Sequence, residues 1–292
     1  MKETNFDKYY SKTPEWQKTF VRQFRATHSE KHLMIDGVDW RYYDSESGAE
    51  ILLLLHGGFV DFDMWIHQIV AFEKDYRIIA PTCPVLPDAT MQQYSEAIYT
   101  ILMEEDIHQV YMMGYSEGGL IAQCFIREHP ELIKKAIFSQ TFYPSSLNKY
   151  FKYDFRFFRT MPAFITEWVF RKFAHPDKEE LHHDSTEWLD WYRSYFRENK
   201  SNLQKDYILT HLDLMMDFSR NYEFHADDLN SWEGELLITV SEDDVVRGYF
   251  EGMKMLYPQA ETHIFPEGLG AHSIALITPQ VFNDRIRAFL SE

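Results

Sequence analysis

Short apolar runs alternate with helical segments along much of the chain. The run at 51–55 reads ILLLL without interruption and ends at His56-Gly57-Gly58, which is typical of a strand buried on both faces of a parallel sheet. Further expected strands follow at 76–81, 108–114 and 134–140. Helices are expected between these strands at about 61–74, 91–105 and 118–128, and another is expected later in the chain at 245–255. Strands that alternate with helices form βαβ units, so the sequence predicts an α/β fold around a parallel sheet.

A long stretch interrupts this alternation. From 143 to about 230 no convincing buried strand occurs, and 15 of the 47 residues at 150–196 are Phe, Trp or Tyr. The strand pattern returns with ELLITV at 235–240 and ETHIF at 261–265, and a last helix is expected from Thr278-Pro279. We therefore predict a core of residues 1–141 and 231–292, with a helical insertion of residues 142–230.

Two local signals lie before the first buried strand. Thr13-Pro14 predicts a helix start, with the threonine as N-cap and proline at the first helical position, running to about Thr27. Asp36-Gly37 separates two runs of strand formers and predicts a hairpin with a type I′ turn.

The net charge limits which partners the chain is expected to bind, and the cysteines bear on its location. The chain carries 29 basic and 46 acidic residues, a formal charge of −17, and a field of this sign repels phosphate backbones and anionic lipid surfaces. We therefore expect neither nucleic acid nor a membrane as partner.

Cys83 and Cys124 show no C-x-x-C spacing, and the polar N-terminus shows no secretion signal, so we expect a cytoplasmic location. The sequence does not indicate an oligomeric state.

The stretch GYSEG, with Ser116 at its centre, follows an expected strand and precedes an expected helix. A sharp strand-to-helix turn exposes the turn side chain above the carboxyl edge of the sheet, and the glycines on either side relieve crowding. The N-terminus of the helix favours negative charge developing nearby. Ser116 is thus a candidate nucleophile, although a serine in an ordinary glycine-rich turn gives the same short motif.

A serine nucleophile needs a base, and the base needs an acid that orients it. Candidates follow the two last expected strands: the acids of SEDD at 241–244 come after one, and His272 after the other. The chain order Ser116, acid, His272 is the order that this architecture uses.

The motifs LLLLHGG, GYSEGG, LLITVSEDDVV and GAHSIALITPQVFNDRIRAFL together resemble the α/β-hydrolase fold, and they bracket the chain from about 51 to 290. The resemblance implies a mostly parallel sheet flanked by helices, with a helical lid inserted after the sixth strand. In this family the acid strand ends in G-x-x-D. That spacing selects Asp244, with serine in place of the glycine; Asp243 and Glu242 remain alternatives. Ala271 precedes the histidine where the family has glycine.

By the same resemblance, the backbone N–H groups of Glu117 and Gly58, with Phe59 as the neighbour of Gly58, form an oxyanion hole, and His56 is structural. The side chain of Glu117 has no role that the sequence indicates. No dinucleotide fingerprint, P-loop or zinc spacing appears, so we expect neither cofactor nor metal.

The favoured function is a serine hydrolase that cleaves a small, apolar carboxylic ester through an acyl-enzyme on Ser116. One alternative is an aminopeptidase of the proline iminopeptidase type, which would hold the substrate amine with acids of the insertion. The acids available there are Glu179, Glu180, Asp184, Glu187 and Asp190. That group usually has tryptophan where this chain has Glu117. Another alternative is a small-molecule receptor that keeps the triad with little turnover. Dehalogenase and epoxide hydrolase chemistry is disfavoured, because those relatives place aspartate at the position of Ser116.

Overall fold

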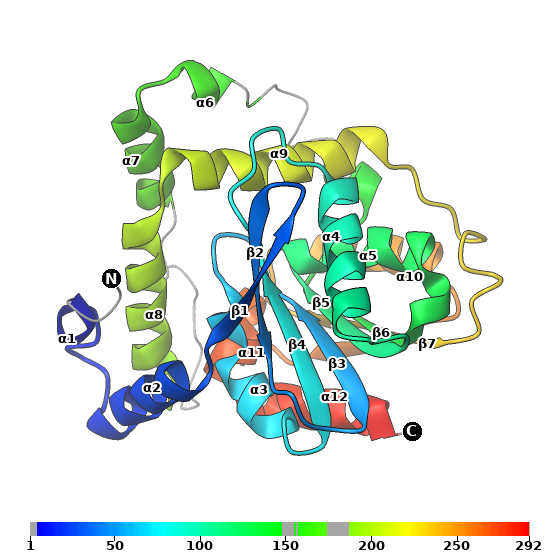
Figure 1. Ribbon diagram of the computed structural model, residues 1–292, viewed down its shortest axis with the longest axis horizontal. Coiled ribbons are helices and arrows are strands. Elements are labelled where there is room, and N and C mark those ends of the chain that lie inside the picture. Colours follow the sequence, from blue (N-terminus) through cyan, green and yellow to red (C-terminus); the bar gives the residue numbers. More distant parts are fainter. Residues whose placement is uncertain (1–4, 148–154, 156, 174–186, 292) are drawn as a thin grey trace.

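The structure is a computed structural model that describes residues 5–147, 155, 157–173 and 187–291 (Figure 1). Its centre is an eight-stranded sheet in the order β1-β2-β4-β3-β5-β6-β7-β8. Strand β2 pairs antiparallel with both of its neighbours, β1 and β4. All the other neighbouring strands in this order, from β4 to β8, pair parallel. The strands are β1 (Glu30–Ile35), β2 (Val38–Asp44), β3 (Glu50–Leu55), β4 (Tyr76–Thr82), β5 (Val110–Tyr115), β6 (Ile133–Ser139), β7 (Glu235–Ser241) and β8 (Glu261–Phe265). The predicted parallel α/β sheet is confirmed.

Helices cover both faces of the sheet (Figure 1). The described helices are α1 (Phe6–Tyr9), α2 (Glu15–Thr27), α3 (Ile66–Phe72), α4 (Met91–Glu104), α5 (Glu117–Glu128), α6 (Phe157–Thr160), α7 (Ala163–Phe173), α8 (Leu189–Asn202), α9 (Lys205–Asn221), α10 (Phe250–Leu256), α11 (Ile274–Ile277) and α12 (Pro279–Ser291). Side chains of β3 alternate between two cores: Leu53 and Leu55 pack with α4 and α5, whereas Leu52 and Leu54 pack with α3 and α12. This alternation explains the unbroken apolar run, since both faces of the strand are buried.

The helices α6 to α9 form the predicted insertion after the sixth strand. In Figure 1, α9 crosses one end of the sheet, and α7 and α8 descend beside it. The boundaries 142 and 230 stay a prediction. Across the described ranges, no helix combines the length and apolarity needed to span a bilayer.

The N-terminal region confirms one local prediction and corrects another. Asp36 and Gly37 form the turn between β1 and β2, with φ of 50° and 81°, as a type I′ hairpin requires. Helix α2 begins at Glu15, one residue after the expected start, and its N-cap is Pro14 instead of Thr13. The Thr13 hydroxyl instead lies 2.9 Å from Ser194 Oγ in α8. A contact made only in the folded chain has therefore replaced the local cap.

The aromatic residues of α8 pack against the core. Trp191 and Tyr195 are stacked and almost fully buried, and the ring of His67 in α3 lies edge-on to Trp191 at 4.9 Å. Other aromatic side chains of the insertion face outward, since Phe164 and Trp168 are 71% and 59% exposed. The aromatic content of α8 thus reflects packing of the insertion on the sheet.

Candidate active site

Ser116 lies at the sharp turn that joins β5 to α5. Its φ of 53° and ψ of −117° place it outside the ordinary regions for a non-glycine residue, as the predicted turn requires. The glycines around it allow close approach of the backbone. A Cβ on Gly118 would lie 2.1 Å from the carbonyl oxygen of Leu55, and one on Gly114 would lie 2.5 Å from the carbonyl oxygen of Gly118. The turn therefore depends on glycine at both positions.

The structure brings Ser116, His272 and Asp244 together from the ends of three strands. The Ser116 hydroxyl lies 2.9 Å from His272 Nε2, and His272 Nδ1 lies 3.0 Å from each carboxylate oxygen of Asp244. The Asp244 side chain is fully buried, and that of His272 is 29% exposed. With Nδ1 donating to the carboxylate, Nε2 carries the lone pair that can accept the serine proton, which is the arrangement of a nucleophile, base and orienting acid.

The two other acids after β7 have different partners. Asp243 Oδ2 accepts from the N–H of Gly268 at 2.9 Å, and Glu242 pairs with Arg247 at 2.9 Å. Neither carboxylate takes the place of Asp244 beside His272.

The two departures from the family pattern contact each other. The Ser241 hydroxyl donates to the carbonyl oxygen of Ala271 at 3.0 Å, directly before the histidine. Gln140 holds the other side of Ser241, since its Nε2 lies 2.8 Å from Ser241 Oγ. Ala271 adopts φ of 45°, the left-handed region that favours glycine. Serine in place of glycine thus provides a bond that fixes the loop of His272.

The loop after β3 faces the turn at Ser116. A Cβ on Gly58 would lie 3.1 Å from Glu117 Oε2, so the loop passes directly over this carboxylate. Phe59 is held at φ of 64°, and its N–H donates to His211 Nε2 at 3.3 Å. Of the two loop amides considered from the sequence, the Phe59 amide is thus directed at His211, which leaves Gly58 as the candidate for the oxyanion hole.

The side chain of Glu117 has a partner that the sequence did not indicate. Glu117 Oε1 lies 2.5 Å from Nδ1 of His211, a residue of α9 that is completely buried. Glu117 Oε2 is also buried, and among the described residues it has no hydrogen-bond partner. The only sequence signal for this pair is a polar residue in the apolar stretch ILTHLDLMM, which does not name a partner 94 residues away.

His56 is fully enclosed beside the same loop. Its Nδ1 lies 2.7 Å from the carbonyl oxygen of Gly57, and its Nε2 accepts from the N–H of Cys83 at 3.0 Å. Burial lowers the pKa of His56 to about 4, so the ring is neutral at pH 7. These contacts fit the structural role expected for it.

Several histidines and acids of the insertion lie outside the described part of the chain. They are His175, His182 and His183, together with Glu179, Glu180 and Asp184 of the aminopeptidase hypothesis. The remaining acids of that hypothesis, Glu187 and Asp190, are exposed. Within the described ranges, no group of three or more His, Cys, Asp or Glu side chains could hold a metal.

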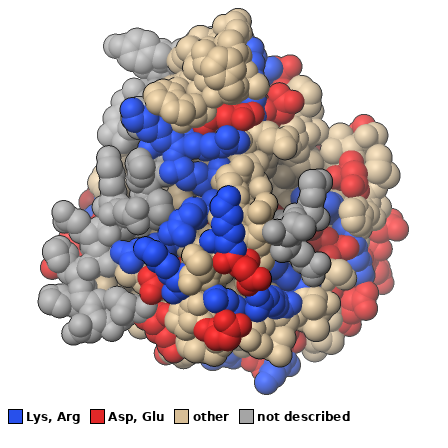
Figure 2. Space-filling model, turned by 90° about the vertical axis from the view of Figure 1, so that its left-hand side faces the viewer, with Lys and Arg blue, Asp and Glu red and all other residues tan. Residues whose placement is uncertain are grey.

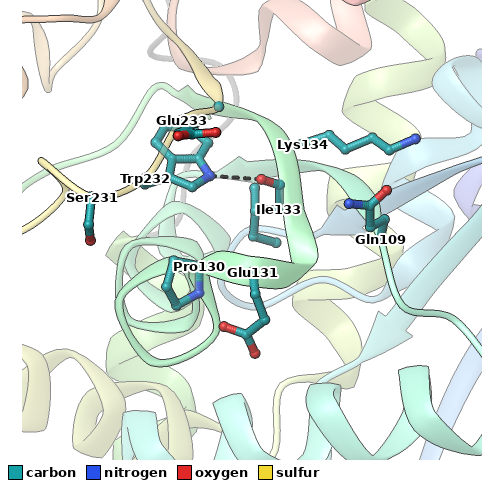
Figure 3. A pocket seen from close by; sticks show the side chains of 9 residues that line it. Gln109, Pro130, Glu131, Ile133, Lys134, Ser231, Trp232 and Glu233 are labelled. Atoms are coloured by element: carbon teal, nitrogen blue, oxygen red, sulfur yellow. Dashed lines mark hydrogen bonds between the residues drawn. The ribbon is translucent and has the colours of Figure 1, made fainter.

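Two cavities flank the sheet at opposite ends. One of about 1300 Å³ adjoins the loop after β3 and is lined by Phe59, Cys83 and Tyr207, among others. The other, of about 470 Å³, lies at the amino ends of β5, β6 and β7 (Figure 3). There the indole N–H of Trp232 donates to the carbonyl oxygen of Ile133 at 2.7 Å. The second cavity is therefore on the edge of the sheet opposite Ser116, because the serine follows the carboxyl end of β5.

A family model described as alpha/beta hydrolase fold matches residues 50–209. Among curated proteins, the chain is 26% identical over 157 residues to mouse "Epoxide hydrolase 4", covering 48% of this chain and 44% of that protein. It is 25% identical over 112 residues to an (E)-2-((N-methylformamido)methylene)succinate hydrolase of Acinetobacter baylyi, covering 36% and 43%. The matched regions thus span less than half the length of these relatives.

Solved structures share the fold over most of the chain. Naproxen esterase from Bacillus subtilis aligns with a TM-score of 0.64 and 18% identity, covering 98% of this chain and 99% of the other. A carboxylesterase of the thaumarchaeon Nitrososphaera gargenis aligns with a TM-score of 0.70 and 18% identity, covering 89% and 98%. At this identity the likeness establishes the common fold alone.

Proposed function

The chain belongs to the α/β-hydrolase fold family, and from this we propose that it is a serine hydrolase that cleaves a small, apolar carboxylic ester. Two of the solved structures with the same fold are a naproxen esterase and a carboxylesterase, which supports an ester as substrate. The observation that carries the proposal is the continuous hydrogen-bonded path from Ser116 through His272 to Asp244.

The first half of the reaction forms an acyl-enzyme. Ser116 Oγ attacks the ester carbonyl while His272 Nε2, at 2.9 Å, accepts the serine proton. His272 then gives this proton to the departing alcohol. Asp244 holds the imidazole in the tautomer with the proton on Nδ1 and stabilises the imidazolium that forms. In the second half, water attacks the acyl group with His272 again as base.

The negative charge of the tetrahedral intermediate needs donors that are in place beforehand. We assign this role to the backbone N–H groups of Glu117 and Gly58. Glu117 is the first residue of α5, so its amide lies at the helix N-terminus, where the peptide dipoles favour an anion.

The relatives named for other chemistry do not change this proposal. One curated relative is named an epoxide hydrolase, but the family members with that chemistry attack through aspartate, and this chain has Ser116. The aminopeptidase alternative gains no support from the two of its acids that the structure describes, Glu187 and Asp190, since both lie on the surface. A cytoplasmic location stays part of the proposal, and the free thiols Cys83 and Cys124 agree with a reducing compartment.

The test is a panel of p-nitrophenyl esters from acetate to longer acyl chains, with the wild type and Ser116→Ala. We expect turnover by the wild type and a loss on the order of 10⁴-fold or more in kcat for Ser116→Ala. Ser291→Ala, which removes an exposed hydroxyl at the end of α12, is the matched control and should turn over as the wild type does. Equal turnover by the wild type and Ser116→Ala would contradict the proposal. Stoichiometric labelling of Ser116 by a fluorophosphonate without ester turnover would favour the receptor alternative.

A further inference from the structure

The loop that carries the candidate oxyanion amide is tied to the insertion by two hydrogen bonds from one helix. Tyr207 and His211 stand one turn apart on α9. The Tyr207 hydroxyl donates to the carbonyl oxygen of Val60 at 2.8 Å, and His211 Nε2 accepts from the N–H of Phe59 at 3.3 Å. The ring centroids of Phe59 and His211 are 4.7 Å apart. Two adjacent loop residues are therefore held by side chains that a helix places on one face.

The same histidine joins this loop to the turn of the nucleophile. His211 Nδ1 lies 2.5 Å from Glu117 Oε1, and the backbone N–H of Glu117 is the other donor assigned to the oxyanion hole. Because Nε2 accepts from Phe59, the ring carries its proton on Nδ1 and donates it to Glu117. One imidazole thus connects the two backbone segments that must converge on the oxyanion.

The pair of His211 and Glu117 is buried and the backbone of Phe59 is strained, so the loss of these bonds should change the shape of the loop. The side chains of His211 and Glu117 are 0% and 4% exposed, so no bulk water replaces either bond if one partner is lost. Phe59 stands at φ of 64°, a conformation that a residue with a side chain adopts only where its surroundings enforce it. Without the bond to His211 the loop can relax toward an ordinary conformation and carry the Gly58 amide with it.

We propose that His211 and Glu117 are positioning residues that hold the oxyanion hole in its working geometry, so that helix α9 of the insertion sets the efficiency of the reaction at Ser116. The inference rests on the proposed function, because it concerns the same site. The pair touches neither substrate nor the reacting atoms; it acts through the amides of Gly58 and Glu117. Its loss therefore lowers kcat and leaves KM nearly unchanged.

The test measures attack by Ser116 with a probe that does not depend on the natural substrate. An alkyl fluorophosphonate forms a bond from Ser116 Oγ to phosphorus and releases fluoride, while His272 takes the serine proton; the phosphoryl oxygen then occupies the oxyanion hole. The second-order rate of labelling is followed by intact mass. Removing an oxyanion donor outright costs about 10²–10³-fold, and since here the donor is only displaced, we expect a loss of about 10- to 100-fold for His211→Ala and Glu117→Ala.

Conservative variants separate positioning from a general structural effect. His211→Gln keeps a carbonyl oxygen that can accept from Phe59, and Glu117→Gln keeps an acceptor for His211, so each should recover most of the loss of its alanine variant. The double alanine variant should be no slower than the worse single variant, because the pair acts as one unit. The matched control is Asp213→Asn, a buried acid on α9 that pairs with Arg159; it should label within about twofold of the wild type.

The results distinguish the two proposals. The inference stands if the alanine variants are folded, label slowly and show reduced kcat on p-nitrophenyl esters at similar KM, with recovery in the glutamine variants. It is overturned if folded His211→Ala labels within twofold of the wild type, or if Asp213→Asn slows labelling as much as His211→Ala. A wild type that neither labels nor hydrolyses esters would overturn the proposed function itself, and the inference with it. A wild type that labels but does not hydrolyse would contradict the ester proposal alone.

Discussion

Asp244 accepts hydrogen bonds from both a histidine ring and a backbone N–H group. Besides the bond from His272, its Oδ1 accepts from the backbone N–H of Val246 at 2.9 Å. Because the side chain is fully buried, these donors replace the water that a carboxylate otherwise requires. Asp243 is exposed on the same turn and bonds to the loop at Gly268. Substitutions of these two adjacent aspartates can therefore be compared directly for their effect on activity.

Asp244→Asn and Asp243→Asn should differ sharply in activity. We expect Asp244→Asn to lower kcat on p-nitrophenyl esters on the order of 10³–10⁴-fold, because the amide stabilises the wrong imidazole tautomer. Asp243→Asn should stay within about threefold of the wild type, since it leaves His272 untouched. A similar loss in both variants would contradict the assignment of the acid to Asp244.

The sequence motifs, together with the family resemblance that selected Asp244, predicted the three side chains of the candidate triad, and the structure places these side chains together. Ser116 could be predicted because the turn needs glycine on both sides, and His272 because it follows the last strand. The pairing of Glu117 with His211 could not be predicted. No local pattern links a turn of the core to a helix of the insertion, and the bond exists only once the chain has folded.

Helix α5 packs on strand β3 at unusually short range. Gly118 lies against the carbonyl oxygens of Leu55 and His56, at 2.1 and 2.5 Å from the position that a Cβ would take. Both contacts are with backbone, so no side chain can rotate away to relieve them. The element that presents Ser116 is therefore fixed against the strand before the oxyanion loop.

Gly118→Ala should destabilise the fold more than an alanine substitution does at an open glycine. We expect a loss of about 3 kcal/mol or more in the free energy of unfolding, because α5 must move away from β3. Gly248→Ala is the control: a Cβ there meets nothing within 4 Å, and its effect should lie within about 0.5 kcal/mol. The prediction is tested by urea unfolding of both variants. Equal unfolding midpoints for Gly118→Ala and Gly248→Ala would contradict the close approach of α5 to β3.

Most elements of the core lie where the sequence predicted them, because each one has a local signal. Apolar runs predicted the buried parallel strands, and Thr278-Pro279 predicted the start of α12. Two expected helices are shorter than predicted: the segment at 61–74 contains a 3₁₀ turn at Phe62–Trp65 before α3, and the segment at 245–255 has another at Arg247–Tyr249 before α10. Such turns are set by packing at the strand ends, which periodicity does not encode.

The charge of the whole molecule is unevenly distributed. Figure 2 shows Lys and Arg side chains gathered over the face that carries α2, α7 and α8, on a chain whose formal charge is −17. Part of this positive charge ties the insertion to the core: Arg25 of α2 lies 2.8 Å from Glu198 of α8 and 3.0 Å from Asp63. The exclusion of nucleic acid rests on the net charge and stays a prediction.

Two buried histidines make the stability of the whole molecule depend on pH. Burial lowers the pKa of His67 to about 3 and that of His56 to about 4, against about 6.5 in the unfolded chain. Below pH 6.5 the unfolded chain therefore binds protons that the folded chain does not. The stability linked to these groups is complete above the unfolded pKa and is lost as the pH falls toward the folded values.

We expect the free energy of unfolding to fall as the pH is lowered from 6.5 to 4, with His67 contributing about 3 kcal/mol of the loss. His67→Phe, which keeps an aromatic ring against Trp191, should make this fall shallower. His108→Phe, at an exposed position, should leave it as in the wild type. Urea unfolding at several pH values tests this, and identical slopes for the wild type and His67→Phe would contradict it.

The proposed hydrolase activity requires covalent attack by Ser116. Rapid quenching of the wild type with a p-nitrophenyl ester, followed by intact mass and peptide mapping, measures this directly. We expect one acyl group on the peptide that contains Ser116, formed before steady state, and no acyl group at this position in Ser116→Ala. Turnover of the ester by the wild type with the acyl group on another residue, or persistence of turnover in Ser116→Ala, would contradict it.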